Sequence, residues 1–260
     1  MSAGNTVAGD TVAGYTVAGD TVALRSTLAG LLSLAAAEEL ILLAATVYRP
    51  ASDGASDGGS DGGRPDRWAA VPLVAHNNHF KRQQAERLAA LAAGQVPATY
   101  GDVDHSSAEV YRGYAAQPAA GVMAECRRVS ADLIDRMWAL PDEDLLDPAR
   151  HPWLNGRLLW LQIIVRGFWH ATGHLGDYYL AHGQPERAIA LQTNALGTAR
   201  YLRAPAAAVG MAGYSLACAQ ARTGLRDEAA RTLAEAIEAN PELRANAGRD
   251  PDLAGVHTEL

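Results

Sequence analysis

The sequence predicts an all-α fold: a four-helix bundle followed by a short extension of the helical-repeat type. Alanine and leucine, which are strong helix formers, are abundant, whereas isoleucine and phenylalanine are scarce. Long stretches of helical pattern are joined by polar loops, and no alternating strand pattern occurs. With 48% hydrophobic residues among 260, the chain can bury a proper core.

The bundle is expected over residues 24–183. The preceding segment, 1–23, repeats Thr-Val-Ala-Gly and predicts a low-complexity, disordered leader. A second biased segment, 51–63, repeats Ser-Asp-Gly without any apolar side chain larger than alanine, which predicts a flexible insertion. The acidic run 141–147 is expected to be a solvated loop. Helices are predicted over 24–48, 69–93 with Asp66 as N-cap, 106–116, 119–140, and 158–182 with Gly183 as C-cap.

The remaining residues, 184–260, predict a tetratricopeptide-like tail with helices over 186–201, 205–223 and 226–239. The last two helices carry small residues that let them pack closely as one hairpin. One hairpin cannot bury both of its faces, so it must pack on the preceding helices or on a partner. The short link 183–185 favours packing on the bundle. Association through the tail, with a second copy of the chain (a homodimer) or with another protein, is an alternative that the sequence leaves open.

Charge and cysteine content exclude several classes of function. The formal charge is −7 and no basic run occurs, so no nucleic-acid partner is expected. The apolar stretch 28–45 is interrupted by Glu38 and Glu39, so no membrane span is expected. Cys126 and Cys218 are far apart and suggest no disulfide framework, and the first residues lack the pattern of a signal peptide. A cytoplasmic protein is therefore expected.

The last bundle helix has the sharpest chemical signal. Gln162, Arg166, His170, His174 and Tyr178 recur every four residues, a spacing that stacks side chains along one face of a helix. His170 and His174, one turn apart, are placed to bind one metal ion. Such a pair is, however, more often two ordinary, partly buried histidines. By the same reasoning, Arg166 is most simply a solvated helix charge.

A third ligand must come from another helix, and the second helix offers two candidates. His76 follows Leu73, Val74 and Ala75, so it has a more apolar local setting than His79. It is therefore the better candidate to face the interior. Three neutral imidazoles leave one coordination position open, which is typical of catalytic metal sites rather than structural ones.

Three stretches resemble the DinB-like superfamily, most closely its ClbS/DfsB branch of four-helix-bundle proteins. They are Asp66 to His76 with Phe80 after it, the Trp-x-x-Gly-Arg-x-x-Trp pattern from Trp153 to Trp160, and the His170/His174 pair. The resemblance covers about residues 24–183 and implies His76, His170 and His174 as metal ligands. Arg166-Gly167 stands where an Asn-Thr pair is common, and Trp169 replaces a polar residue, so substrate identity does not transfer.

The resemblance implies an enzyme that acts on an electrophilic small molecule. It is either a hydrolase that opens strained rings such as cyclopropanes with water, in self-resistance or detoxification, or a metal-dependent transferase that uses a low-molecular-weight thiol such as mycothiol. A divalent Zn, Ni or Fe ion is the expected cofactor. Arg166 and Tyr178 are the candidate catalytic residues, and a pocket is expected from Phe80, Trp160, Gln162 and Trp169. The alternative is a non-catalytic protein that sequesters a metabolite or acts as a scaffold.

Overall fold

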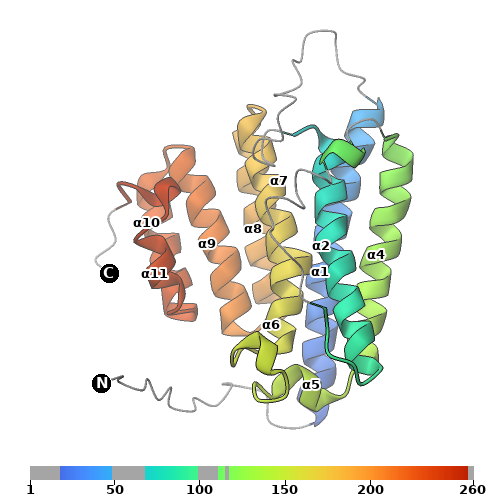
Figure 1. Cartoon of the computed structure of the whole chain (residues 1–260). Helices are drawn as coiled ribbons and strands as arrows, with labels where there is room; N and C mark the ends of the chain where they lie inside the picture. The colour runs from blue at the N-terminus through green and yellow to red at the C-terminus, as the bar shows by residue number, and fades with distance from the viewer. Residues whose placement is uncertain (1–17, 49–67, 99–110, 115–116, 257–260) are drawn as a thin grey trace, which may run out of the picture.

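The computed structural model describes residues 18–48, 68–98, 111–114 and 117–256 of the chain, and it contains no strand within these ranges. Four long helical segments pack side by side (Figure 1). They are α1 (Ala18–Tyr48), α2 (Ala70–Ala92), α4 (Ala119–Ala139) and a composite helix, which consists of α6 (Leu159–Ile164), a π-helical turn (Val165–Trp169) and α7 (His170–Ala181). We call these four segments the bundle. The all-α prediction is confirmed.

The N-terminal end of α1 differs from the expectation of a disordered leader up to residue 23. The helix already begins at Ala18, and its first turns are anchored to the end of α4. Arg25 donates to the carbonyl of Leu140 (2.8 Å) and to the Asp142 carboxylate (2.7 Å), and Thr21 donates to the same carboxylate (2.8 Å). These bonds explain why the helix extends into the repeat. Residues 1–17 and the expected insertion 51–63 lie outside the described residues.

Two other boundaries differ from the predictions. The N-cap of α2 is Ala69, which makes no side-chain capping bond, and the predicted cap Asp66 lies outside the described residues. The acidic run after α4 is not a solvated loop but contains the short helix α5 (Asp142–Leu146), whose Leu145 is fully buried. Of the predicted helix 106–116, residues 111–114 are described and are helical.

The tail consists of α8 (Pro185–Tyr201), α9 (Ala206–Arg222) and α10 (Arg226–Ala239), followed by α11 (Leu243–Ala247) and a 3₁₀ turn (Pro251–Leu253) that the sequence did not predict. The predicted close packing of the hairpin is confirmed. A Cβ atom on Gly210 would lie 2.6 Å from Asn240 Cβ, and one on Gly213 would lie 3.1 Å from Ala236 Cβ. At the start of the tail, Gly183 has a φ of 67°, the left-handed conformation of a helix-ending glycine.

The tail shares its core with the bundle. One cluster of buried apolar residues includes Leu28 of α1, Leu133 of α4, Ile164 of α6, Ala195 of α8 and Leu233 of α10. Across the same boundary, Thr27 of α1 donates to the carbonyl of Leu202 (2.8 Å). The tail therefore packs on the bundle, as the short link predicts.

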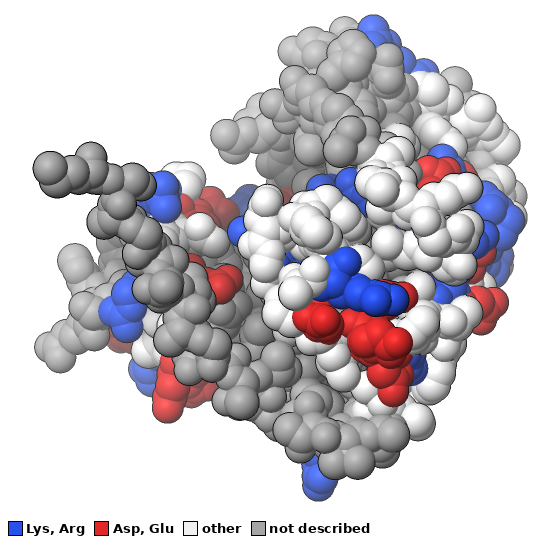
Figure 2. Space-filling model, turned by 60° about the horizontal axis from the view of Figure 1, so that its bottom comes forward, with Lys and Arg blue, Asp and Glu red and all other residues white. Residues whose placement is uncertain are grey.

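Helix α1 also contains a segment, Thr21–Val47, with the length and hydropathy of a membrane span, longer than the sequence analysis expected. Several of its leucines are buried against the other helices, namely Leu24, Leu28, Leu31 and Leu32. Figure 2 looks onto the end of the bundle near α5, where basic and acidic side chains lie next to each other without a broad region of one sign among the described residues.

Candidate metal centre

The composite fourth helix is not a uniform α-helix, and this decides which side chains reach the site. Its π-helical turn spans Val165–Trp169, immediately before His170. A π turn accommodates one extra residue. The side chains before it are therefore rotated about the helix axis by roughly 100° relative to a continuous α-helix. His170 and His174 lie on the regular α-helix after this turn and so keep the predicted spacing, whereas Trp160 and Gln162 lie before it.

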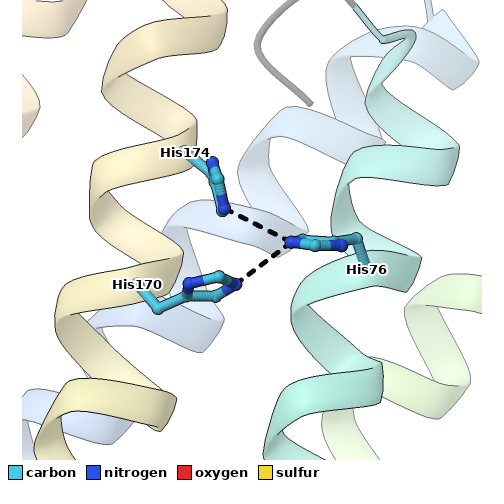
Figure 3. Close-up of side chains that lie close together, drawn as sticks. All are labelled: His76, His170 and His174. Carbon is cyan, nitrogen blue, oxygen red and sulfur yellow. Dashed lines mark hydrogen bonds between the residues drawn. The ribbon is translucent and has the colours of Figure 1, made fainter. Parts of the chain in front are cut away.

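His170 and His174 meet His76 of α2 in the interior of the bundle (Figure 3). The Nε2 atom of His76 lies 3.1 Å from Nε2 of His170 and 3.3 Å from Nε2 of His174. The ligand atoms of the three residues all lie within 4.8 Å of one another. His76 is 1% exposed, and the other two are partly buried.

The two Nε2 distances measured from His76 fit the ligand spacing of a tetrahedral metal ion. Two nitrogen ligands at about 2.0–2.1 Å from zinc, with a tetrahedral angle between them, lie about 3.3–3.4 Å apart. The two Nε2 distances from His76 are within a few tenths of an ångström of this value. Metal-binding histidines usually donate their other ring N–H to a hydrogen-bond acceptor. Nδ1 of His76 departs from this pattern, because it is buried without a hydrogen-bond partner among the described residues.

Burial keeps two of the imidazoles neutral. It lowers the pKa of His76 to about 3, with a smaller contribution from His174, and it also lowers the pKa of His170. The charges of Arg166 and Lys81 act in the same direction on His170. Neutral imidazoles have a free lone pair, and this is the form that binds metal ions.

His79, the competing candidate on α2, lies outside the cluster. Its Nε2 atom lies 2.8 Å from Nε2 of Gln83, one turn further along the same helix. The choice of His76 over His79 as the histidine that faces the interior therefore agrees with the structure.

Phe80 and Arg166 lie directly beside the histidines. The Phe80 ring centroid is 4.5 Å from that of His170 and 4.8 Å from that of His76. The Arg166 guanidinium lies over the Phe80 ring at 5.0 Å. Arg166 forms no ion pair among the described residues, and burial lowers its pKa. Within the described part of the chain, a positive charge without an acidic partner therefore lies close to His170.

The other predicted pocket residues have different surroundings. Trp160 is 3% exposed and packs in the main core, and Gln162 is half-buried on α6. Tyr178 stacks on the ring of His182 at 3.9 Å and contacts Tyr179. Trp169 does line a cavity, of about 280 Å³, which also borders His170 and His174. Trp160, Gln162 and Tyr178 do not belong to the described lining of this cavity.

A buried polar network in the bundle was missed by the sequence analysis. Lys81 of α2 is in direct contact with Glu39 of α1, and the Cys126 thiol of α4 donates to Glu39 at 3.2 Å. Burial raises the pKa of Cys126 to about 12, so this thiol is protonated and no nucleophile at neutral pH. The signal that could have revealed the network is the charge of Glu39 inside an otherwise apolar helix.

Comparisons of the chain with protein-family models, with curated proteins and with solved structures gave no match. The functional argument therefore rests on the site itself.

Proposed function

We propose that this chain is a metal-dependent enzyme acting on an electrophilic small molecule, with His76, His170 and His174 as the ligands of a divalent Zn, Ni or Fe ion. The observation that carries the proposal is the convergence of three imidazole Nε2 atoms within 4.8 Å of one another in a largely buried setting.

Hydrogen bonding between the histidines does not account for this arrangement. Nε2 of His76 faces Nε2 atoms of both His170 and His174. A neutral imidazole nitrogen either donates its one proton or accepts through its one lone pair, so it can satisfy only one of these contacts well. A cation among the three nitrogens accepts all three lone pairs at once, and the neutral state of His76 and His170 suits that role.

A divalent ion held by three imidazoles supplies Lewis acidity, which turns water or a thiol into a nucleophile at neutral pH. The chain's own residues have separate roles. Arg166 stabilises a carboxylate or a developing oxyanion of the substrate, because its charge is half-buried and has no carboxylate partner among the described residues. Phe80 keeps the rings of His76 and His170 in place and excludes water from one side.

The resemblance to the ClbS/DfsB branch favours a strained-ring electrophile such as a cyclopropane, and a role in self-resistance or detoxification. Epoxides are also strained three-membered electrophiles and serve as probes. Two nucleophiles are compatible with the site: water, which makes the chain a hydrolase, and a low-molecular-weight thiol, which makes it a transferase. The chain's own Cys126 does not serve as the nucleophile, because its thiol is protonated and completely buried.

Product analysis tests the proposal. The metal-loaded protein is incubated with styrene oxide, phenylglycidate and glycidyltrimethylammonium, each with and without N-acetylcysteine, and diols and thioethers are measured by mass spectrometry. We expect catalysed formation of one product class, and its loss after treatment with a chelator. Binding of these epoxides without catalysed formation of either product would contradict the enzyme and favour sequestration.

A variant tests the role of Arg166. Arg166→Gln is expected to lower turnover by about 10²-fold without changing metal content, because one stabilising donor for the developing anion is removed. The matched control is Arg187→Gln. Arg187 also lies over an aromatic ring, that of Tyr179 at 4.7 Å, but it lies on α8 and is exposed. Equal activity of the two variants would contradict the role of Arg166.

A further inference from the structure

The cavity beside His170 and His174 lies between the bundle and the tail. Helix α7 forms one wall, and α8, α9 and the last 3₁₀ turn form the others. Two contacts mark its ends: the Trp169 indole donates to Ser215 Oγ at 2.8 Å, and Arg222 forms an ion pair with Asp177. Trp169 and Asp177 are eight residue steps apart, which is about 12 Å along the helix axis.

Small residues contribute to the open space between these two contacts. They are Gly173 of α7 and Cys218 and Ala219 of α9. A Cβ atom on Gly173 would find no other atom within 4 Å, so open space lies in front of this residue. With about 280 Å³, the cavity is close to the lower end of the range for small-molecule sites.

Charge at the Arg222 end is negative. The lining includes two carboxylates, Asp177 and Asp252, and one guanidinium, Arg222, which lies 3.5 Å from Asp252, so the balance is −1. A third carboxylate, Asp250, lies behind the wall and accepts a hydrogen bond from Tyr214 at 2.7 Å. A positively charged group is favoured at this end.

A buried acceptor in the lining has no partner. Gln192 is 2% exposed, and its Nε2 donates to the carbonyl of Thr172 at 2.8 Å, which fixes the orientation of the amide. Its Oε1 atom is buried without a hydrogen-bond partner among the described residues. An unsatisfied buried acceptor of this kind is destabilising, and an N–H group of a ligand that donates to it removes that cost.

We infer that this cavity binds a small organic cation: a compound whose planar apolar body lies against Trp169 and Gly173 and whose amine faces Asp177, Asp252 and Gln192. His170 and His174 border the same space, so a group on the ligand's body reaches the proposed metal centre. The assignment of this ligand as the substrate rests on the proposed function, whereas binding in the cavity does not. The tail thus forms part of the binding site.

Three compounds with similar bodies test the charge preference: phenethylamine, phenethyl alcohol and 3-phenylpropionate. Their dissociation constants are measured by ligand-observed NMR, in protein loaded with zinc and in protein treated with chelator. We expect phenethylamine to bind at least tenfold more tightly than 3-phenylpropionate in both preparations. A parent protein that retains no metal and turns over no epoxide, yet still prefers the amine, would overturn the proposed function and leave the cation site standing. Equal or tighter binding of 3-phenylpropionate would overturn the cation site.

Two variants test the location. Gly173→Leu fills the open space and is expected to weaken phenethylamine binding more than tenfold. The control is Gly197→Leu, because Gly197 is an exposed helical glycine of α8 with equally open surroundings. This control should leave binding unchanged. Asp252→Asn should weaken the amine about two- to fivefold and leave the alcohol unaffected, because the lost ion pair is partly exposed. Equal binding by the two glycine variants, or no effect of Asp252→Asn on the amine, would overturn the proposed site.

Discussion

Lys81 of α2 and Glu39 of α1 form an ion pair in the interior of the bundle, with side chains that are 1% and 0% exposed. Two charges in such a position are expensive to desolvate, and they are tolerated because each compensates the other. Lys81 also bonds Ser130 at 3.5 Å, and the Cys126 thiol bonds Glu39. Sequence periodicity treats α1 as an apolar core helix and does not predict this pair, because the partners are 42 residues apart.

Breaking this pair is expected to destabilise the protein strongly. Lys81→Met should lower the free energy of unfolding by about 3–5 kcal/mol, because it leaves the Glu39 charge buried and alone. The double variant Lys81→Met/Glu39→Leu should recover most of this loss. Urea denaturation measures both. The control Arg200→Ala removes an exposed ion pair with Glu235 and should cost about 1 kcal/mol or less. A similar loss of unfolding free energy in Lys81→Met and in Arg200→Ala would contradict this account.

At the scale of the helix, the π turn before His170 separates what the sequence predicts well from what it does not. The HxxxH pair follows the turn on a regular α-helix, so its spacing alone places both imidazoles on one face. Gln162 precedes the turn, so a continuous α-helix is the wrong basis for its phase relative to the histidines. Such a turn has no simple signature in a single sequence, because tertiary packing stabilises it.

Gly167 lies in the π turn at the closest approach of three helices. A Cβ atom on this residue would lie 2.3 Å from Leu32 Cδ2 of α1 and 3.0 Å from Leu133 Cδ2 of α4, and both leucines are buried. Gly167→Ala is therefore expected to lower the free energy of unfolding by about 1–3 kcal/mol despite its better helix propensity.

The matched control is Gly197→Ala, which has open space around its Cβ position and should stabilise by about 0.4–1 kcal/mol. Thermal unfolding of the two variants beside the parent measures the contrast. Stabilisation by Gly167→Ala would show that the π turn is not held by close packing against α1 and α4.

At the scale of the whole molecule, the sequence predicts the helical class, the order of the long helices and the close hairpin of the tail. It also selects His76, His170 and His174, which the structure brings together. It does not predict the cavity, whose walls come from α7 together with Gln192, Ser215, Arg222 and Asp252 of the tail. These residues have no motif of their own, and only the packing of α8 and α9 on the bundle places them beside the histidines.

We propose that His76, His170 and His174 hold one metal ion, although His76 is 94 residues from His170 and 98 residues from His174 in the sequence. Metal content by mass spectrometry of protein purified without an affinity tag, after incubation with Zn, Ni or Fe and removal of unbound ions, tests it most directly. We expect about one ion per chain in the parent and in His79→Ala, and a large loss in His76→Ala, His170→Ala and His174→Ala, each still folded by circular dichroism. No stoichiometric metal in the parent, or equal content in the parent and in His170→Ala, would contradict the three-histidine centre.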